Sequence, residues 1–184
     1  MQRMEIRFSG FGGQGVVFAS ILLGTAAVEH DGLKAVQTQS YGAAARGGAV
    51  RAEVILSREP VEYPLVTATD ALVAMSQTAM DRYLPDAAPG SVIIYDPDLV
   101  NPPNKDGIRA VPIQATHMAN QELGQSLAAN IIMIGALLAL TDVVSEQGVR
   151  AALASMSSAK TQKTNERALA LGLEAGRKLR QHSA

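Results

Sequence analysis

The feature that most constrains the fold is a cluster of glycines between an alternating segment and an apolar one. Residues 4–9 alternate apolar and polar side chains, which predicts a β-strand. Four glycines follow within residues 10–15, and residues 14–29 are rich in Ala, Leu, Val and Ile, as in a helix packed on a sheet. A second short strand is predicted at 34–39. Together these segments form a strand–helix–strand unit, whose crossover we expect to be right-handed.

The remaining segments extend this unit into an α/β pattern. Two near-continuous apolar runs, 71–75 and 91–96, are typical of parallel strands buried on both faces. We expect strands at 51–57, 71–75, 91–96 and 108–113, and helices at 77–84, 123–140, 145–156 and 164–179, with Ser145 as an N-cap. The sequence therefore predicts one domain over residues 1–184. Its fold class is α/β, a Rossmann-like, doubly wound and mostly parallel sheet with an antiparallel excursion and helices on both faces.

The glycine cluster has the features of a phosphate-binding turn. Gly10, Gly12 and Gly15 fit the spacing G-x-G-x-x-G. Glycines permit positive φ angles and close backbone approach, and the following helix would present free N–H groups to an anion. Gln14 lies beside these groups and offers both a donor and an acceptor. A phosphate-bearing ligand is one interpretation of the turn; close packing of helix on sheet, or approach of another subunit, is the other.

The sequence disfavours NAD as that ligand. A dinucleotide fold places an acidic residue at the end of its second strand, where it binds the ribose hydroxyls. Here the second strand ends in Gln37-Thr38-Gln39-Ser40, and Asp31 precedes the strand.

A second loop and one amide complete the set of candidate binding residues. Residues 40–48, "SYGAAARGG", have no apolar period and are predicted to be a loop. Arg46 is suited to bind a carboxylate or phosphate, or is simply solvated. Asn130 leads into an apolar run, where it caps a helix, bonds within the core or contacts a ligand. The candidate ligand-binding residues are Gly10, Phe11, Gly12, Gly13, Gln14, Gly15, Ser40, Tyr41, Arg46, Gly47, Gly48 and Asn130.

Composition excludes several classes of function. The chain has no cysteine, so it offers no disulfide, thiolate nucleophile or cysteine-ligated iron–sulfur cluster. Its three histidines have no partner at a metal-binding spacing, and no catalytic residue or metal site is predicted. A net charge of −1 and 4% aromatic residues argue against nucleic-acid binding. The longest apolar run is too short to span a bilayer and no signal segment is evident, so we expect no membrane partner and a cytoplasmic location.

Longer stretches of the chain resemble a known family. They are "IRFSGFGGQGVVFAS", "QTQSYGAAARGGAVRAEVILS", "YPLVTATDALVAMSQTAMDRY" and "GSVIIYD", with looser agreement in "NIIMIGALLAL" and "KTNERALALGLEAG". These segments resemble the gamma subunit of the 2-oxoacid:ferredoxin oxidoreductases, most closely the 2-oxoglutarate branch. The indolepyruvate oxidoreductase beta chain shares the G-G-Q-G turn. Relatives often carry Pro and Glu where Ala43 and Ala44 stand here.

The resemblance implies a role within a larger enzyme. Such complexes decarboxylate a 2-oxoacid on thiamine diphosphate, pass electrons through iron–sulfur clusters to ferredoxin, and release an acyl-CoA. The resemblance places thiamine diphosphate and the clusters in alpha, beta or delta partner subunits, and associates the gamma domain with coenzyme A and assembly. We therefore expect an isolated chain that is inactive and self-associates. A stand-alone nucleotide-binding enzyme and a purely structural assembly domain are the alternatives.

Overall fold

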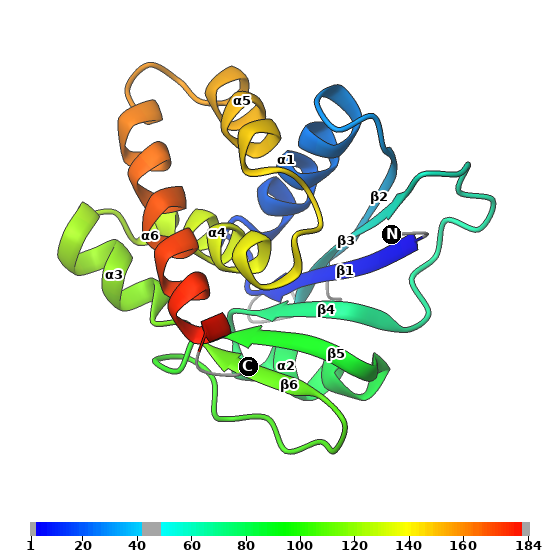
Figure 1. Cartoon of the computed structure of the whole chain (residues 1–184). Helices are drawn as coiled ribbons and strands as arrows, with labels where there is room; N and C mark the ends of the chain where they lie inside the picture. Colours follow the sequence, from blue (N-terminus) through cyan, green and yellow to red (C-terminus); the bar gives the residue numbers. More distant parts are fainter. Residues whose placement is uncertain (1–2, 42–48, 182–184) are drawn as a thin grey trace.

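The computed structural model describes residues 3–41 and 49–181, which form one six-stranded sheet and its covering helices (Figure 1). The sheet order is β2-β3-β1-β4-β5-β6. The strands are β1 (Arg3–Gly10), β2 (Lys34–Ser40), β3 (Val50–Ser57), β4 (Thr69–Ala74), β5 (Ala87–Tyr95) and β6 (Arg109–Pro112). The helices are α1 (Val16–Glu29), α2 (Gln77–Tyr83), α3 (Ala115–Leu123), α4 (Ala129–Thr141), α5 (Glu146–Met156) and α6 (Gln162–Gln181).

The pairing confirms the predicted fold class. Strands β1, β4, β5 and β6 run parallel, as expected for a doubly wound sheet. Strands β1 and β2 of the predicted strand–helix–strand unit are parallel but not adjacent, because β3 lies between them and is antiparallel to both. The antiparallel excursion is therefore β3, inserted into the unit whose ends are β1 and β2.

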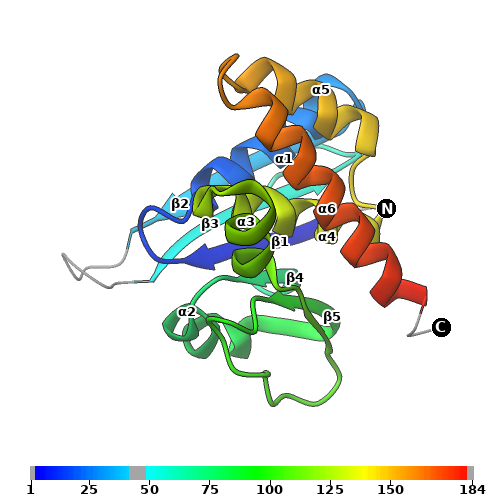
Figure 2. The same cartoon turned by 90° about the vertical axis from the view of Figure 1, so that its left-hand side faces the viewer.

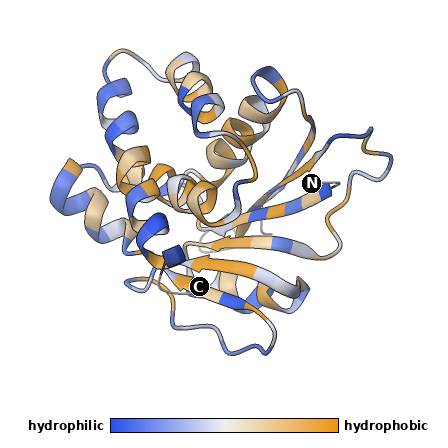
Figure 3. Ribbon diagram, in the orientation of Figure 1, coloured by the Kyte–Doolittle hydropathy of each residue, from blue (hydrophilic) through white to orange (hydrophobic). Residues whose placement is uncertain are grey.

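The helices cover the two faces of the sheet unequally. The larger core lies on one face of the sheet, where alternate residues of β1, β3 and β4 pack with α1, α4, α5 and α6. The smaller core lies on the opposite face, where residues of β4 and β5 pack with α2. Figure 2 shows α2 on the opposite side of the sheet from the other helices. Apolar residues concentrate on the central strands and α4, whereas the outer surfaces of α3 and α6 are polar (Figure 3).

The helix predicted over residues 123–140 begins only at Ala129, because residue 123 is the last residue of a separate helix, α3, and a turn follows it. Gly124 takes the left-handed conformation (φ 62°) at the end of α3, and Ala119 O accepts a hydrogen bond from Gln125 N. A left-handed residue cannot continue a right-handed helix, so the chain turns before α4 begins. Residues 129–140 of α4 are all buried, as the apolar composition predicts. Elsewhere Ser145 is the N-cap of α5, as predicted, and its Oγ accepts from Gly148 N at 2.9 Å.

Two glycines allow α4 and α6 to cross at backbone contact. A Cβ on Gly135 would lie 2.5 Å from Leu169 O, and a Cβ on Gly172 would overlap Ile132 O. Within residues 3–41 and 49–181, no helix combines the length and apolar character needed to cross a membrane.

Candidate functional site

The glycine turn leaves the carboxyl end of β1 and is tied to β4 by one side chain. Gln14 Oε1 accepts a hydrogen bond from Phe11 N at 2.6 Å, and Gln14 Nε2 donates to Met75 O at 2.8 Å. Met75 follows β4, the strand beside β1. The Gln14 amide therefore spans the opening between the two strands and fixes the turn. A Cβ on Gly10 would collide with this amide, which explains a glycine at that position.

Asn130 fixes the other end of the turn. Gly15 is the N-cap of α1, with φ 76°, and its carbonyl accepts from Asn130 Nδ2 at 3.2 Å and from Ala19 N at 3.0 Å. Asn130 is 7% exposed, and its Oδ1 has no hydrogen-bond partner among the described residues. Of the roles that the sequence left open for Asn130, the structure shows a hydrogen bond from the first turn of α4 to the glycine turn.

The middle of the turn is open. A Cβ built on Gly12 or Gly13 would meet no atom of the described residues within 4 Å, and only Gly13 of the two has a left-handed φ, 94°. The N–H groups of Phe11 and Gln14 are bonded within the turn, whereas those of Gly12 and Gly13 have no acceptor in the described part of the chain. Neither packing nor backbone conformation therefore explains glycine at position 12. The lack of a side chain at Gly12 leaves the backbone accessible at the start of α1, where no side chain among the described residues caps the helix.

The register places the second predicted loop at the same edge of the sheet. Val50, the first residue of β3, pairs directly with Gly10, and Ser40 pairs with Arg51. The chain therefore leaves β2 after Ser40 and returns beside the glycine turn. Tyr41 is 65% exposed. Arg46, Gly47 and Gly48 lie outside the described residues.

The topology also bears on the dinucleotide alternative. In a dinucleotide fold the second strand neighbours the first, so that its acidic residue reaches the ribose. Here β3 separates β1 from β2, which puts the end of β2 roughly 10 Å from β1. This separation is unsuited to the NAD-binding arrangement.

A cavity of about 480 Å³ adjoins the turn on its helical side. It lies between the first turns of α1 and α4 and the segment that joins α5 to α6. Phe18, Leu127, Ile131 and Met156 give it an apolar wall, and Asn130 is part of the lining. Leu127 is 67% exposed, so an apolar side chain stands free at its rim.

Sequence reasoning missed a buried ion pair on the opposite face of the sheet. Arg7 is 1% exposed; its Nε and Nη2 each lie 2.7 Å from Glu53 Oε1, and its Nη1 lies 2.6 Å from Asp86 Oδ2. The guanidinium also lies over the Tyr83 ring, 4.9 Å from its centroid. The signal was Arg7 in the middle of an alternating strand, a position that indicates exposure to solvent unless both faces of the sheet are covered.

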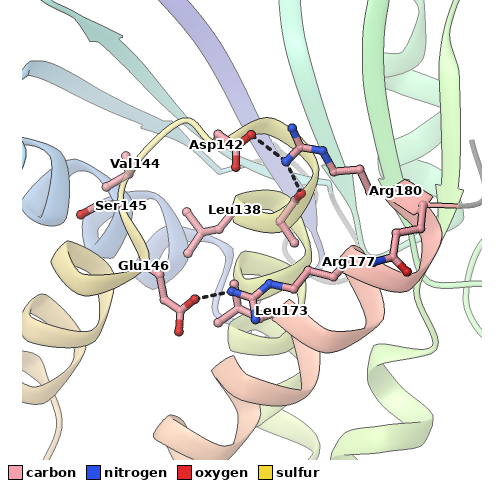
Figure 4. A pocket seen from close by; sticks show the side chains of 10 residues that line it. Leu138, Asp142, Val144, Ser145, Glu146, Leu173, Arg177 and Arg180 are labelled. Atoms are coloured by element: carbon pink, nitrogen blue, oxygen red, sulfur yellow. Dashed lines mark hydrogen bonds and ion pairs between the residues drawn. The ribbon is translucent and has the colours of Figure 1, made fainter. Parts of the chain in front are cut away.

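A second cavity, of about 430 Å³, opens at the far end of α4 (Figure 4). Its arginines are matched by acids: Arg180 Nη1 lies 2.6 Å from Asp142 Oδ2, and Arg177 Nη2 lies 2.6 Å from Glu146 Oε2. The hydrogen bond from Arg150 is the largest influence lowering the pKa of Glu146, with the charges of Arg150 and Arg177 acting in the same sense against burial. Each arginine that lines this cavity is therefore already paired with a carboxylate.

No metal site was predicted, and the described part of the chain contains no group of three His, Cys, Asp or Glu side chains arranged to hold a metal. The candidate site consists of the glycine turn, held by Gln14 and Asn130, at the carboxyl edge of the parallel strands.

Several known proteins are similar to this chain over nearly its whole length. The 2-oxoglutarate synthase subunit KorC of Methanothermobacter thermautotrophicus is 46% identical over 183 residues, which cover 96% of this chain and 95% of KorC. The gamma subunit of a keto/oxoacid ferredoxin oxidoreductase from Geobacter sulfurreducens superposes with a TM-score of 0.88 at 39% identity, covering 96% of this chain and 97% of that one.

A longer protein contains the same domain. The 2-oxoglutarate:ferredoxin oxidoreductase of Magnetococcus marinus, solved with 2-oxoglutarate, coenzyme A and succinyl-CoA bound, matches at 26% identity with a TM-score of 0.78. That match covers 97% of this chain but 30% of the longer one. Residues 5–175 also match the family described as pyruvate ferredoxin/flavodoxin oxidoreductase. The chain belongs to the pyruvate ferredoxin/flavodoxin oxidoreductase family.

Proposed function

We propose that this chain is the gamma-type subunit of a 2-oxoglutarate:ferredoxin oxidoreductase, and that its glycine turn binds phosphate groups of coenzyme A. This proposal rests mainly on one observation: the backbone of Gly12 and Gly13 is accessible in the described structure, at the start of α1, where no side-chain hydrogen bond caps the helix. N–H groups at a helix N-terminus favour an anion, and no atom of residues 3–41 or 49–181 lies within 4 Å of a Cβ built on Gly12 or Gly13. The similar Magnetococcus enzyme, which was solved with coenzyme A bound, supports this choice of ligand.

In this proposal the redox chemistry belongs to partner subunits. The chain has no cysteine to ligate an iron–sulfur cluster. We assign thiamine diphosphate and the clusters to alpha, beta or delta chains of a cytoplasmic complex that reduces ferredoxin. The contribution of this chain is to hold coenzyme A by its phosphates and so orient the thiol toward the acyl group formed elsewhere. Gln14 and Asn130 act by keeping the turn in its binding shape.

The test is a pair of substitutions at Gly12. Gly12→Asp adds a negative charge where the phosphate would lie, at a position where a Cβ meets no described atom within 4 Å, and Gly12→Asn adds nearly the same bulk without the charge. In enzyme reconstituted with its partner subunits, Gly12→Asp should raise KM for coenzyme A roughly tenfold to a hundredfold, since a charge-assisted contact contributes about 1.5–3 kcal/mol. KM for 2-oxoglutarate should stay constant, and Gly12→Asn should have a smaller effect.

The same pair separates ligand binding from assembly. If Gly12→Asp copurifies normally with the partner subunits and leaves KM for coenzyme A unchanged, the turn is not a phosphate site. If both variants fail to copurify, the turn is an interface with another subunit, and the structural-domain alternative replaces the proposal.

A further inference from the structure

The two edges of the sheet differ in how far they are protected against pairing with another strand. At one edge β6 has four residues, ends in Pro112, and carries Arg109, whose Nη2 lies 3.5 Å from Leu179 O of α6. At the other edge β2 is seven residues long, contains no proline and carries one charge, Lys34, at its first position. Long edge strands without proline or interior charge present free N–H and C=O groups to another strand.

We propose that β2 pairs antiparallel with β2 of a second copy of this chain, which joins the two sheets across a two-fold axis at Gln37. The strand suits this partner because it is self-complementary about its centre. In that register Gln37 meets its own copy, Val36 lies opposite Thr38, and Lys34 lies opposite Ser40, so no like charges meet. Within residues 3–41 and 49–181, β3 is the only strand that pairs with β2, so the outer backbone groups of β2 have no strand partner there.

Helix α1 supports the same interface. It covers β2 and β3: a Cβ on Gly24 would contact Ala35 and Val54, and Gln37 Nε2 donates to Ser20 Oγ at 3.1 Å. On its uncovered flank α1 exposes Ile21 (41%) and Val28 (51%), seven positions apart and therefore two turns apart on one side. A two-fold axis normal to the sheet keeps both copies of α1 on the same face and runs them antiparallel. Ile21 of one copy then approaches Val28 of the other.

The absence of cysteine makes the test direct. Gln37→Cys introduces a single thiol that the proposed axis places beside its own copy, at a spacing that suits a disulfide. Under mild oxidation the full chain should form a disulfide-linked dimer. Ala110→Cys, an exposed position on β6, is the matched control at the other edge and should cross-link much more slowly.

Sedimentation provides a second test that does not depend on the introduced thiol, in case Gln37→Cys perturbs the strand. Sedimentation of the cysteine-free chain should give a dimer. The Val36→Lys/Thr38→Lys double variant, which sets ammonium groups opposite one another, should sediment as a monomer with an unchanged circular dichroism spectrum. A monomer before substitution, or a dimer that survives the double substitution, overturns the β2 interface. Equal cross-linking at positions 37 and 110 does the same.

Discussion

Asn130 Nδ2 donates a hydrogen bond to the carbonyl oxygen of Gly15 at 3.2 Å, although 115 residues separate the two along the chain. The contact joins the first turn of α4 to the start of α1. It also fills the space beside Gly15, so that a Cβ at this position would collide with the Asn130 amide.

Gly15→Ala should therefore lower the free energy of unfolding by about 2 kcal/mol or more, because a side chain at φ 76° is strained and also displaces Asn130. Gly12→Ala is the control, since its Cβ meets no described atom and its φ is not left-handed. It should change the free energy by less than about 0.5 kcal/mol. Urea denaturation of both variants measures the difference; equal losses would contradict the role assigned to Asn130.

Removing only one partner of the buried Arg7–Glu53 ion pair should strongly lower the free energy of unfolding. Arg7→Met removes the guanidinium and leaves Glu53, which is 5% exposed, without its main partner. The expected loss is about 3–5 kcal/mol. Arg7→Met/Glu53→Leu removes both buried charges and should recover a large part of that loss. Thermal melting of the single and double variants checks the prediction, which fails if their losses simply add.

The α4–α6 crossing should not tolerate a methyl group. Gly172→Ala places a Cβ against the backbone of Ile132, and backbone cannot move aside as a flexible side chain can. We expect a loss of about 1–3 kcal/mol from overpacking, even though alanine is the better helix former. Ala170→Gly, at an exposed position of the same helix, is the control and should cost about 1 kcal/mol for propensity alone. A stabilised Gly172→Ala variant would show that the helices are not in contact there.

Glu146 should contribute to stability at neutral pH and not in acid. Its pKa is lowered from 4.5, chiefly by the Arg150 hydrogen bond, so the folded state favours the charged carboxylate. This contribution is present above pH 4.5 and is lost as the pH falls through the lowered pKa. Because the pair is partly exposed, Glu146→Gln should cost less than about 1 kcal/mol at pH 7. The difference should vanish in acid, whereas Glu62→Gln at an exposed position should show none at either pH.

Much of the architecture could be predicted from local patterns. Period-2 alternation located β1 and β3, continuous apolar runs located β4 and β5, and Ser145 marked the start of α5. The family was also identified from sequence motifs, and the comparison over residues 5–175 confirms it. These predictions succeeded because side-chain periodicity and capping depend on residues a few positions apart.

Long-range pairing could not be predicted in the same way. The sequence predicted a strand–helix–strand unit but not the strand within it, and only the register, with Gly10 opposite Val50 and Ser40 opposite Arg51, shows β3 between β1 and β2. The turn at Gly124, which ends α3 before α4 begins, was likewise missed, since a single glycine is tolerated in many helices.

The candidate site, too, was predicted in part from local sequence and in part only from contacts between distant residues. The sequence by itself determined that a glycine turn ends the first strand, that no cysteine is available for a cluster, and that Asn130 enters an apolar helix. Only the tertiary structure decided which glycine serves which purpose: Gly10 makes room for Gln14, Gly15 makes room for Asn130, and a Cβ on Gly12 would contact none of the described residues. The physical reason is that the need for a missing side chain is set by atoms that reach the turn from β4 and α4, which are distant in sequence and near only in the folded chain.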